Sequence, residues 1–135
     1  MFVLPSEAQQ RSLLDHDRPG PVVMLNLLRF REIADYETSP QLAPATPISG
    51  TDAYTRYAKG TLPLLMNHDA ELLFRGEASA FLIGPETERW DQVLLIRYPS
   101  LAVFLAFTTD PRYLAVAGHR TAALEDSRLL PMSQG

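Results

Sequence analysis

The chain has 135 residues, a length at which one domain buries roughly two-thirds of its unfolded surface without needing disulfide bonds. It contains no cysteine, which excludes disulfides, thiolate catalysis and cysteine-bound metals, and its net charge of −4 with scattered arginines argues against a nucleic-acid partner. No apolar run approaches the roughly 20 residues of a membrane helix, so we expect one cytoplasmic domain, residues 1–135, with no membrane partner.

The first predicted element is a short helix within an N-terminal extension, residues 1–21. Ser6 and Gln9 have the spacing of a capping box, and the helix is expected to end near Leu14. The run from Asp17 to Pro21 (DRPGP) then breaks the chain.

A buried strand and a long loop come next. Val22 to Phe30 reads VVMLNLLRF, and nearly continuous apolar residues of this kind predict a strand that is buried on both faces. Residues 31–49 contain three prolines and little periodicity, so we interpret them as a proline-rich loop. A loop of that length inside a compact domain is usually a lid, a binding loop or an arm.

The middle of the chain predicts a helix followed by a hairpin. The helix runs from about Asp52 to Asn67, capped by Ser49 or Thr51. Strands are predicted over Leu72–Ile83 and Trp90–Tyr98, and the short turn between them requires an antiparallel hairpin.

The last part of the chain predicts two helices and a final strand. Ser100 caps a short helix that ends near Phe107, and Asp110 with Pro111 starts a second one, which carries an apolar side as far as Leu124. Ser127 to Met132 is then read as the last strand.

The order of strands and helices predicts an α+β domain with a ferredoxin-like βαββαβ fold and an extra N-terminal helix. Helices would cover one face of a four-stranded antiparallel sheet. The strands are apolar on both sides, whereas a sheet with one wet face shows clean alternation. We therefore expect a second copy of the chain to cover the other face, which makes a homodimer and a dimeric α+β barrel.

Five segments of the sequence resemble a bacterial family of domains of unknown function (number thirteen-thirty), within the dimeric α+β-barrel superfamily. The resemblance covers about Pro21 to Leu130 and is carried by MLNLLRFRE, ADYETSPQLAPATPISG, AYTRYAKGTLPLL, FLIGPETERWDQVLLIRYPS and DPRYLAVAGHRTAALEDSRL. It implies the fold and the dimer. It implies no reaction, since the superfamily includes cofactor-free monooxygenases, isomerases, heme-dependent enzymes and binding proteins.

Four polar residues are candidates for a ligand pocket between the sheet and the two main helices. Asn26 interrupts an apolar strand, and a buried amide must find hydrogen-bond partners, either within the protein or on a ligand. Tyr54 and Tyr57 lie on the inward side of the second helix, as pocket residues or as ordinary core. Arg120 flanks the apolar side of the last helix, either as an anion clamp or as a surface arginine paired with an acid. Together they favour a compact ligand with a carboxylate or carbonyl group.

Two further residues are weaker candidates. Trp90, at a strand end, either seals the hairpin or stacks on a ligand. His119 is the histidine worth checking as a heme ligand. However, the three histidines, His16, His68 and His119, lack the spacing of metal ligands, so we expect neither a metal nor a cofactor.

The expected function is that of a small-molecule-binding protein, with different mechanisms left open. The first is a cofactor-independent enzyme, monooxygenase- or isomerase-like, acting on a small polar or aromatic organic compound. The alternative is a non-catalytic ligand-binding or regulatory domain. An enzyme should place a group with a shifted pKa beside a group that stabilises an electrophile, whereas a binder needs only shape and a few hydrogen bonds. A purely structural interaction protein would leave the pocket filled with side chains.

Overall fold

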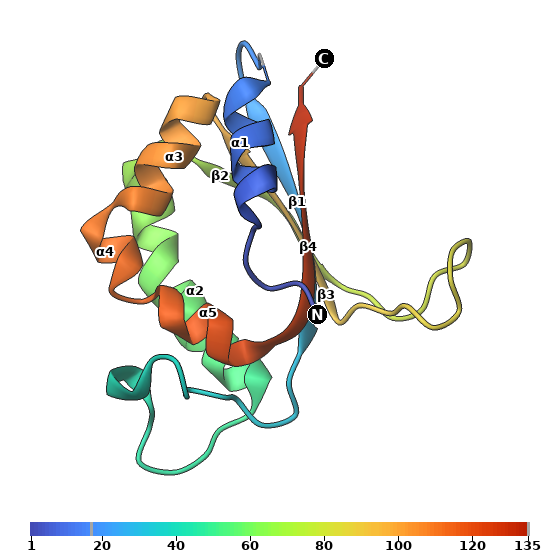
Figure 1. Cartoon of the computed structure of the whole chain (residues 1–135), viewed down its shortest axis with the longest axis vertical. Helices are drawn as coiled ribbons and strands as arrows, with labels where there is room; N and C mark the ends of the chain where they lie inside the picture. Colours follow the sequence, from blue (N-terminus) through green and yellow to red (C-terminus); the bar gives the residue numbers. More distant parts are fainter. Residues whose placement is uncertain (17, 135) are drawn as a thin grey trace.

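The computed structural model describes residues 1–16 and 18–134, so Asp17 of the expected chain break lies outside the described residues. Four strands form one antiparallel sheet, and the helices form a second layer on one face of it (Figure 1). The sheet has the order β2-β3-β1-β4, with β1 at Val22–Phe30, β2 at Glu71–Glu77, β3 at Gln92–Tyr98 and β4 at Leu124–Ser133. This is the split βαβ arrangement, so the predicted ferredoxin-like α+β fold is confirmed.

The helices begin where capping residues stand in the sequence. They are α1 (Glu7–Asp15), the 3-10 turn η1 (Pro40–Leu42), α2 (Gly50–Asn67), α3 (Leu101–Thr109), α4 (Pro111–Leu114) and α5 (Ala117–Ala123). Ser6 and Gln9 form the predicted capping box of α1, and the Ser49 hydroxyl accepts the amide of Asp52 at the start of α2. Within the described residues, no helix is long and apolar enough to cross a membrane. In the proline-rich loop, residues 31–49, η1 is the only helical segment and there is no strand.

Three predicted elements have the wrong bounds. β2 ends at Glu77 instead of Ile83, because the chain leaves the sheet there, although the pairing of β2 with β3 is antiparallel as predicted. β4 begins at Leu124, in what was predicted to be the last helix, because Leu124 is fully buried and pairs with Phe30. The same helix is split into α4 and α5 by a turn at Ala115 and Val116.

Alternate residues of β1 point into the helix layer and form two separate apolar clusters. Val22 and Met24 pack near the start of the strand with Leu64, Leu65, Tyr98 and Phe107. Leu28 packs near the end of β1 with Tyr54, Leu94, Ala123 and Leu124. Asn26 has the same orientation as these residues and stands between the two clusters.

The opposite face of the sheet carries no helix (Figure 1), and its centre is apolar, with Arg97 and Arg128 beside Val23 and Leu27. Leu25 lies near its centre, paired with Leu95 on β3 and with Leu130 on β4. Val23 and Leu27 flank Leu25 on this face, and both remain partly exposed. We call this surface the open face. It shows why β1 reads as apolar on both sides in the sequence.

Candidate functional site

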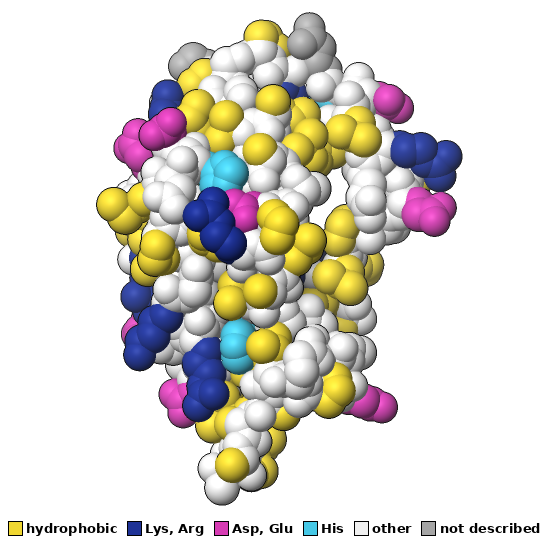
Figure 2. Space-filling view, turned by 90° about the vertical axis from the view of Figure 1, so that its left-hand side faces the viewer, with side chains coloured by type: hydrophobic (Ala, Val, Ile, Leu, Met, Phe, Trp, Pro, Cys, Tyr) yellow, Lys and Arg dark blue, Asp and Glu magenta, His cyan; other side chains and the backbone are white. Residues whose placement is uncertain are grey.

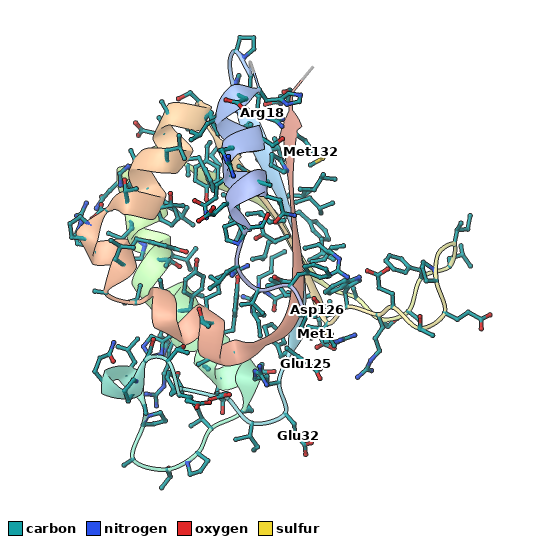
Figure 3. All side chains as sticks on the ribbon, viewed as in Figure 1. Met1, Arg18, Glu32, Glu125, Asp126 and Met132 are labelled. Atoms are coloured by element: carbon teal, nitrogen blue, oxygen red, sulfur yellow. The ribbon has the colours of Figure 1, made fainter. Side chains whose placement is uncertain are left out.

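Four tyrosines from three elements gather between the sheet and the helices, and we call them the tyrosine cluster. The Tyr57 hydroxyl donates to the Tyr113 hydroxyl at 3.1 Å, and the ring of Tyr54 lies 5.2 Å from that of Tyr57 between centroids. Tyr98, on β3, joins the group through Phe107, whose ring is 5.9 Å from Tyr98 and 4.7 Å from Tyr113. Side chains from both layers meet in this space (Figure 3).

Three phenols of the tyrosine cluster, those of Tyr54, Tyr57 and Tyr98, are held in their protonated form. Burial raises the pKa of Tyr54 to about 12, against opposing effects of the Arg120 and Arg75 charges. Burial also raises the pKa of Tyr57 well above its ordinary value, and that of Tyr98 as well. At neutral pH these groups therefore act as hydrogen-bond donors and not as bases.

Asn26 has hydrogen-bonding capacity to spare. Its side-chain nitrogen donates to the Met24 carbonyl at a long 3.3 Å, and its side-chain oxygen has no partner among the described residues. The residue is only partly buried, and its neighbour on β4, Leu129, is 45% exposed although it faces the helix layer. The helix side of the sheet is therefore incompletely covered beside Asn26. No residue of the nearby α1 is buried.

Arg120 reaches the same region from α5. One of its terminal nitrogens donates to the Val3 carbonyl at 2.9 Å, and its charge acts on both Tyr54 and Tyr57. It forms no ion pair with an acid among the described residues, so the interpretation as a salt-bridged surface arginine is wrong. Thus the structure brings together Tyr54, Tyr57 and Arg120 from the predicted set.

His119 and Trp90 lie elsewhere. Nδ1 of His119 is 2.7 Å from the hydroxyl of Tyr36, in the proline-rich loop. Trp90 is 2% exposed and packs beneath the guanidinium of Arg128 at the base of the hairpin, with its indole nitrogen unbonded among the described residues. This placement agrees with the sealing role considered for Trp90.

His119 is expected to titrate below pH 6.5, because burial and the positive charge of Arg56 lower its pKa. The unfolded chain then takes up the proton more readily, so stability is lost as the pH falls through about 6.5 towards the folded-state pKa. A proton NMR titration of the His119 imidazole should give a midpoint below pH 6.5, and Arg56→Gln should raise that midpoint. Lys59→Gln, also on α2, should not. A midpoint above 6.5 would contradict the burial of this ring.

Within the described residues two surface hollows stand out, and neither is lined by Asn26, Tyr54, Tyr57 or Arg120. The larger, about 810 Å³, lies where the strands end beside the start of α2; the smaller, about 310 Å³, lies in the proline-rich loop. The larger contains both signs of charge: Arg31, Arg75, Arg89, Glu32, Glu77, Asp91 and Glu125. Its carboxylates offset its arginines, so it has no preference for anions. The outer surface of the helix layer is similarly mixed in charge (Figure 2).

No group of three histidine or acidic side chains close enough to hold a metal ion occurs within residues 1–16 and 18–134. The phenols of the tyrosine cluster and the neighbouring guanidinium of Arg120 are hydrogen-bond donors at neutral pH and not metal ligands.

Sequence reasoning missed two members of this site, Tyr98 and Tyr113. Tyr98 could have been found, because it alternates with Leu94 and Ile96 on the same face of its strand. Tyr113 lies in the helix predicted to start at Pro111, and no local signal shows that it meets Tyr57, 56 residues away.

The comparisons with known proteins agree with this architecture. Residues 42–131 match the model of a family described as "Domain of unknown function (DUF1330)". A solved protein of unknown function from Rhodopseudomonas palustris is 33% identical, with a TM-score of 0.87, over 98% of this chain and 96% of that chain. A dimeric protein of unknown function with a ferredoxin-like fold, from Bacteroides fragilis, is 12% identical, with a TM-score of 0.52, over 87% of this chain and 100% of its own. None of the curated proteins matches.

Proposed function

Because the chain belongs to the DUF1330 family, which has no assigned reaction, we propose from its geometry that it binds a small organic compound between the sheet and the helices, as a homodimer. The observation that carries the proposal is a set of polar side chains with unused hydrogen-bonding capacity among the apolar residues on the helix side of the sheet. Asn26 contributes its free oxygen, and Tyr54 a hydroxyl without a partner among the described residues.

The chemistry of these groups favours an acceptor ligand. The protonated phenol of Tyr54 and the guanidinium of Arg120 are donors, while the Asn26 amide can donate and accept. A compact compound with a carboxylate or carbonyl would match them, and the aromatic rings would cover its apolar part. Leu129, exposed beside Asn26, marks where such a compound would enter from the β4 side.

A non-catalytic binding role fits these groups better than a cofactor-independent enzyme. A monooxygenase- or isomerase-like reaction would need a proton acceptor beside the donors, and the tyrosines stay protonated at neutral pH. His119, whose lowered pKa suits proton transfer, is engaged with Tyr36. Turnover of a bound compound by the purified protein would favour the enzyme.

The homodimer is supported by the open face. Two copies that pack these faces together would bury the apolar row of Leu25, Leu95 and Leu130 from both sides. The Bacteroides fragilis protein, described as dimeric, shares the fold that makes this pairing possible. Each subunit would then have one site, between its sheet and its helices, on the side of the sheet that faces away from the partner.

Binding is tested with benzoate, a compact aromatic carboxylate, and with benzamide as its uncharged counterpart. At a concentration that adds about 1 kcal/mol of binding free energy, benzoate should raise the unfolding temperature by about 4 °C. Benzamide should raise it less, because it lacks the charge that Arg120 attracts. A wider series of small carboxylates without any shift would contradict the proposal.

Asn26→Leu is expected to remove the benzoate effect. The free energy of unfolding should stay the same or rise by up to about 1 kcal/mol, because the amide makes only one long local hydrogen bond. Urea unfolding with and without benzoate measures both quantities. Thr55→Leu, an exposed change on α2, is the control and should retain the benzoate shift. A loss of about 1–3 kcal/mol for Asn26→Leu would show that Asn26 is a satisfied core residue instead.

A further inference from the structure

Residues 78–91, between β2 and β3, form a two-stranded arm that leaves the sheet. The Ala78 amide donates to the Asp91 carbonyl at 3.0 Å, and that of Trp90 to the Ser79 carbonyl at 3.1 Å. Ala80 pairs with Arg89 in an isolated antiparallel bridge. The arm projects on the side of the sheet opposite the helices, which is the side of the open face (Figure 1).

The base of the arm is firmly packed, whereas its tip touches almost nothing. At the base, Trp90 is buried beneath Arg128, which also pairs with Glu88 at 3.4 Å. At the tip, Leu82 is 99% exposed and Ile83 90% exposed. A hairpin held rigidly at one end thus presents two large aliphatic side chains to water. This is unfavourable unless another surface covers them.

We propose that the tip of the arm, residues 81–83, docks on a second copy of this chain. The inference rests on the proposed homodimer and adds that each subunit clasps the other. The arm and the open face lie on the same side of the sheet, so a copy that covers the face also lies alongside the arm.

The length of the arm sets how far it reaches. Leu82 lies five positions after Glu77, the end of β2, and extended chain advances about 3.3 Å per residue, which gives roughly 17 Å. Packed sheets lie about 10 Å apart. An arm that stands off its own sheet therefore extends past the plane of the partner's sheet, and its tip meets the partner's edge or helix layer.

The charges next to the tip disfavour a membrane as the occupant. Glu86, three positions after Ile83, is exposed, and anionic lipid surfaces repel carboxylates. A second copy of the chain does not need a positive charge to meet Glu86. The apolar tip of the arm and the apolar open face lie on the same side of the sheet, so one copy can contact both.

The absence of cysteine makes a direct test possible. Leu82→Cys, labelled with a benzophenone maleimide, should on illumination form a covalent dimer of about twice the 15.1 kDa chain mass. Mixing ¹⁵N-labelled and unlabelled protein beforehand should yield hybrid crosslinked peptides, which prove that the link joins two subunits. Gln10→Cys, exposed on α1 in the helix layer, is the matched control and should not give this product.

A second measurement tests the energetic role of the tip. The double change Leu82→Ser and Ile83→Ser should raise the dimer dissociation constant at least about ten-fold, because it removes apolar side chains from both docked tips. Glu86→Ser with Thr87→Ser, in the same loop, should leave it unchanged. A native protein that is monomeric at micromolar concentration contradicts the homodimer itself. A dimer whose Leu82→Cys variant crosslinks no better than the control contradicts the arm alone.

Discussion

Replacing Leu25 with aspartate should convert the proposed homodimer into a folded monomer of 15.1 kDa. Leu25 lies near the centre of the open face, flanked by Leu95 and Leu130. A two-fold axis brings both copies of the new carboxylate into one apolar interface, where burial without a partner costs several kcal/mol. We therefore expect the dissociation constant to rise about a thousand-fold, which corresponds to about 4 kcal/mol.

Light scattering after gel filtration over a range of concentrations measures this change. Gln10→Asp, an equally charged substitution on exposed α1, should remain dimeric. Circular dichroism should show an unchanged sheet, because Leu25 points away from both core clusters. If Leu25→Asp remains dimeric, the copies do not associate through the open face.

Gly50→Ala is expected to lower the free energy of unfolding by more than about 3 kcal/mol, at the upper end of what overpacking costs. A Cβ atom at Gly50 would lie 2.6 Å from the Ala123 carbonyl oxygen and 2.7 Å from the Arg31 nitrogen, and would also collide with the Arg31 oxygen. These are backbone atoms, held by hydrogen bonds from Gly50 to Arg31 (3.0 Å) and from Arg31 to Ala123 (2.8 Å). None of them can move without separating α2 from the sheet.

The matched control is Gly20→Ala, at a glycine with a φ of +78° where an added Cβ atom would have no neighbouring atom within 4 Å. It should cost only about 1–2 kcal/mol, from the left-handed backbone conformation alone. Urea unfolding of both variants gives the comparison. Equal losses would mean that the start of α2 can relax and that the close packing at Gly50 has little energetic weight.

Much of the fold followed from local signals. Serines at helix starts, read with the residues three positions later, located α1, α2 and α3 to within about two residues. The apolar run of β1 located that strand at Val22–Phe30 and indicated that both of its faces carry apolar residues. The end of β2 could not be read in this way, because the arm continues the same strand-like pattern beyond Glu77.

Only some of the residues of the candidate site could be predicted from the sequence. Helical spacing placed Tyr54 and Tyr57 on one side of α2, and the polarity of Asn26 marked its strand position. The contact of Tyr57 with Tyr113 joins residues that are 56 positions apart, and that of Tyr36 with His119 joins residues 83 apart. No periodicity within one element encodes such pairs.

Periodicity, caps and breakers alone therefore determined the element order, the ferredoxin-like topology and the apolar character of both sheet faces. These are properties of contiguous residues, whose backbone preferences and side-chain alternation act locally. Only the tertiary structure decided which tyrosines meet, that His119 faces the proline-rich loop and Trp90 the base of the arm, and that residues 78–91 project from the sheet. Those outcomes depend on how the layers pack, because packing sets the distances between residues that are remote in the chain.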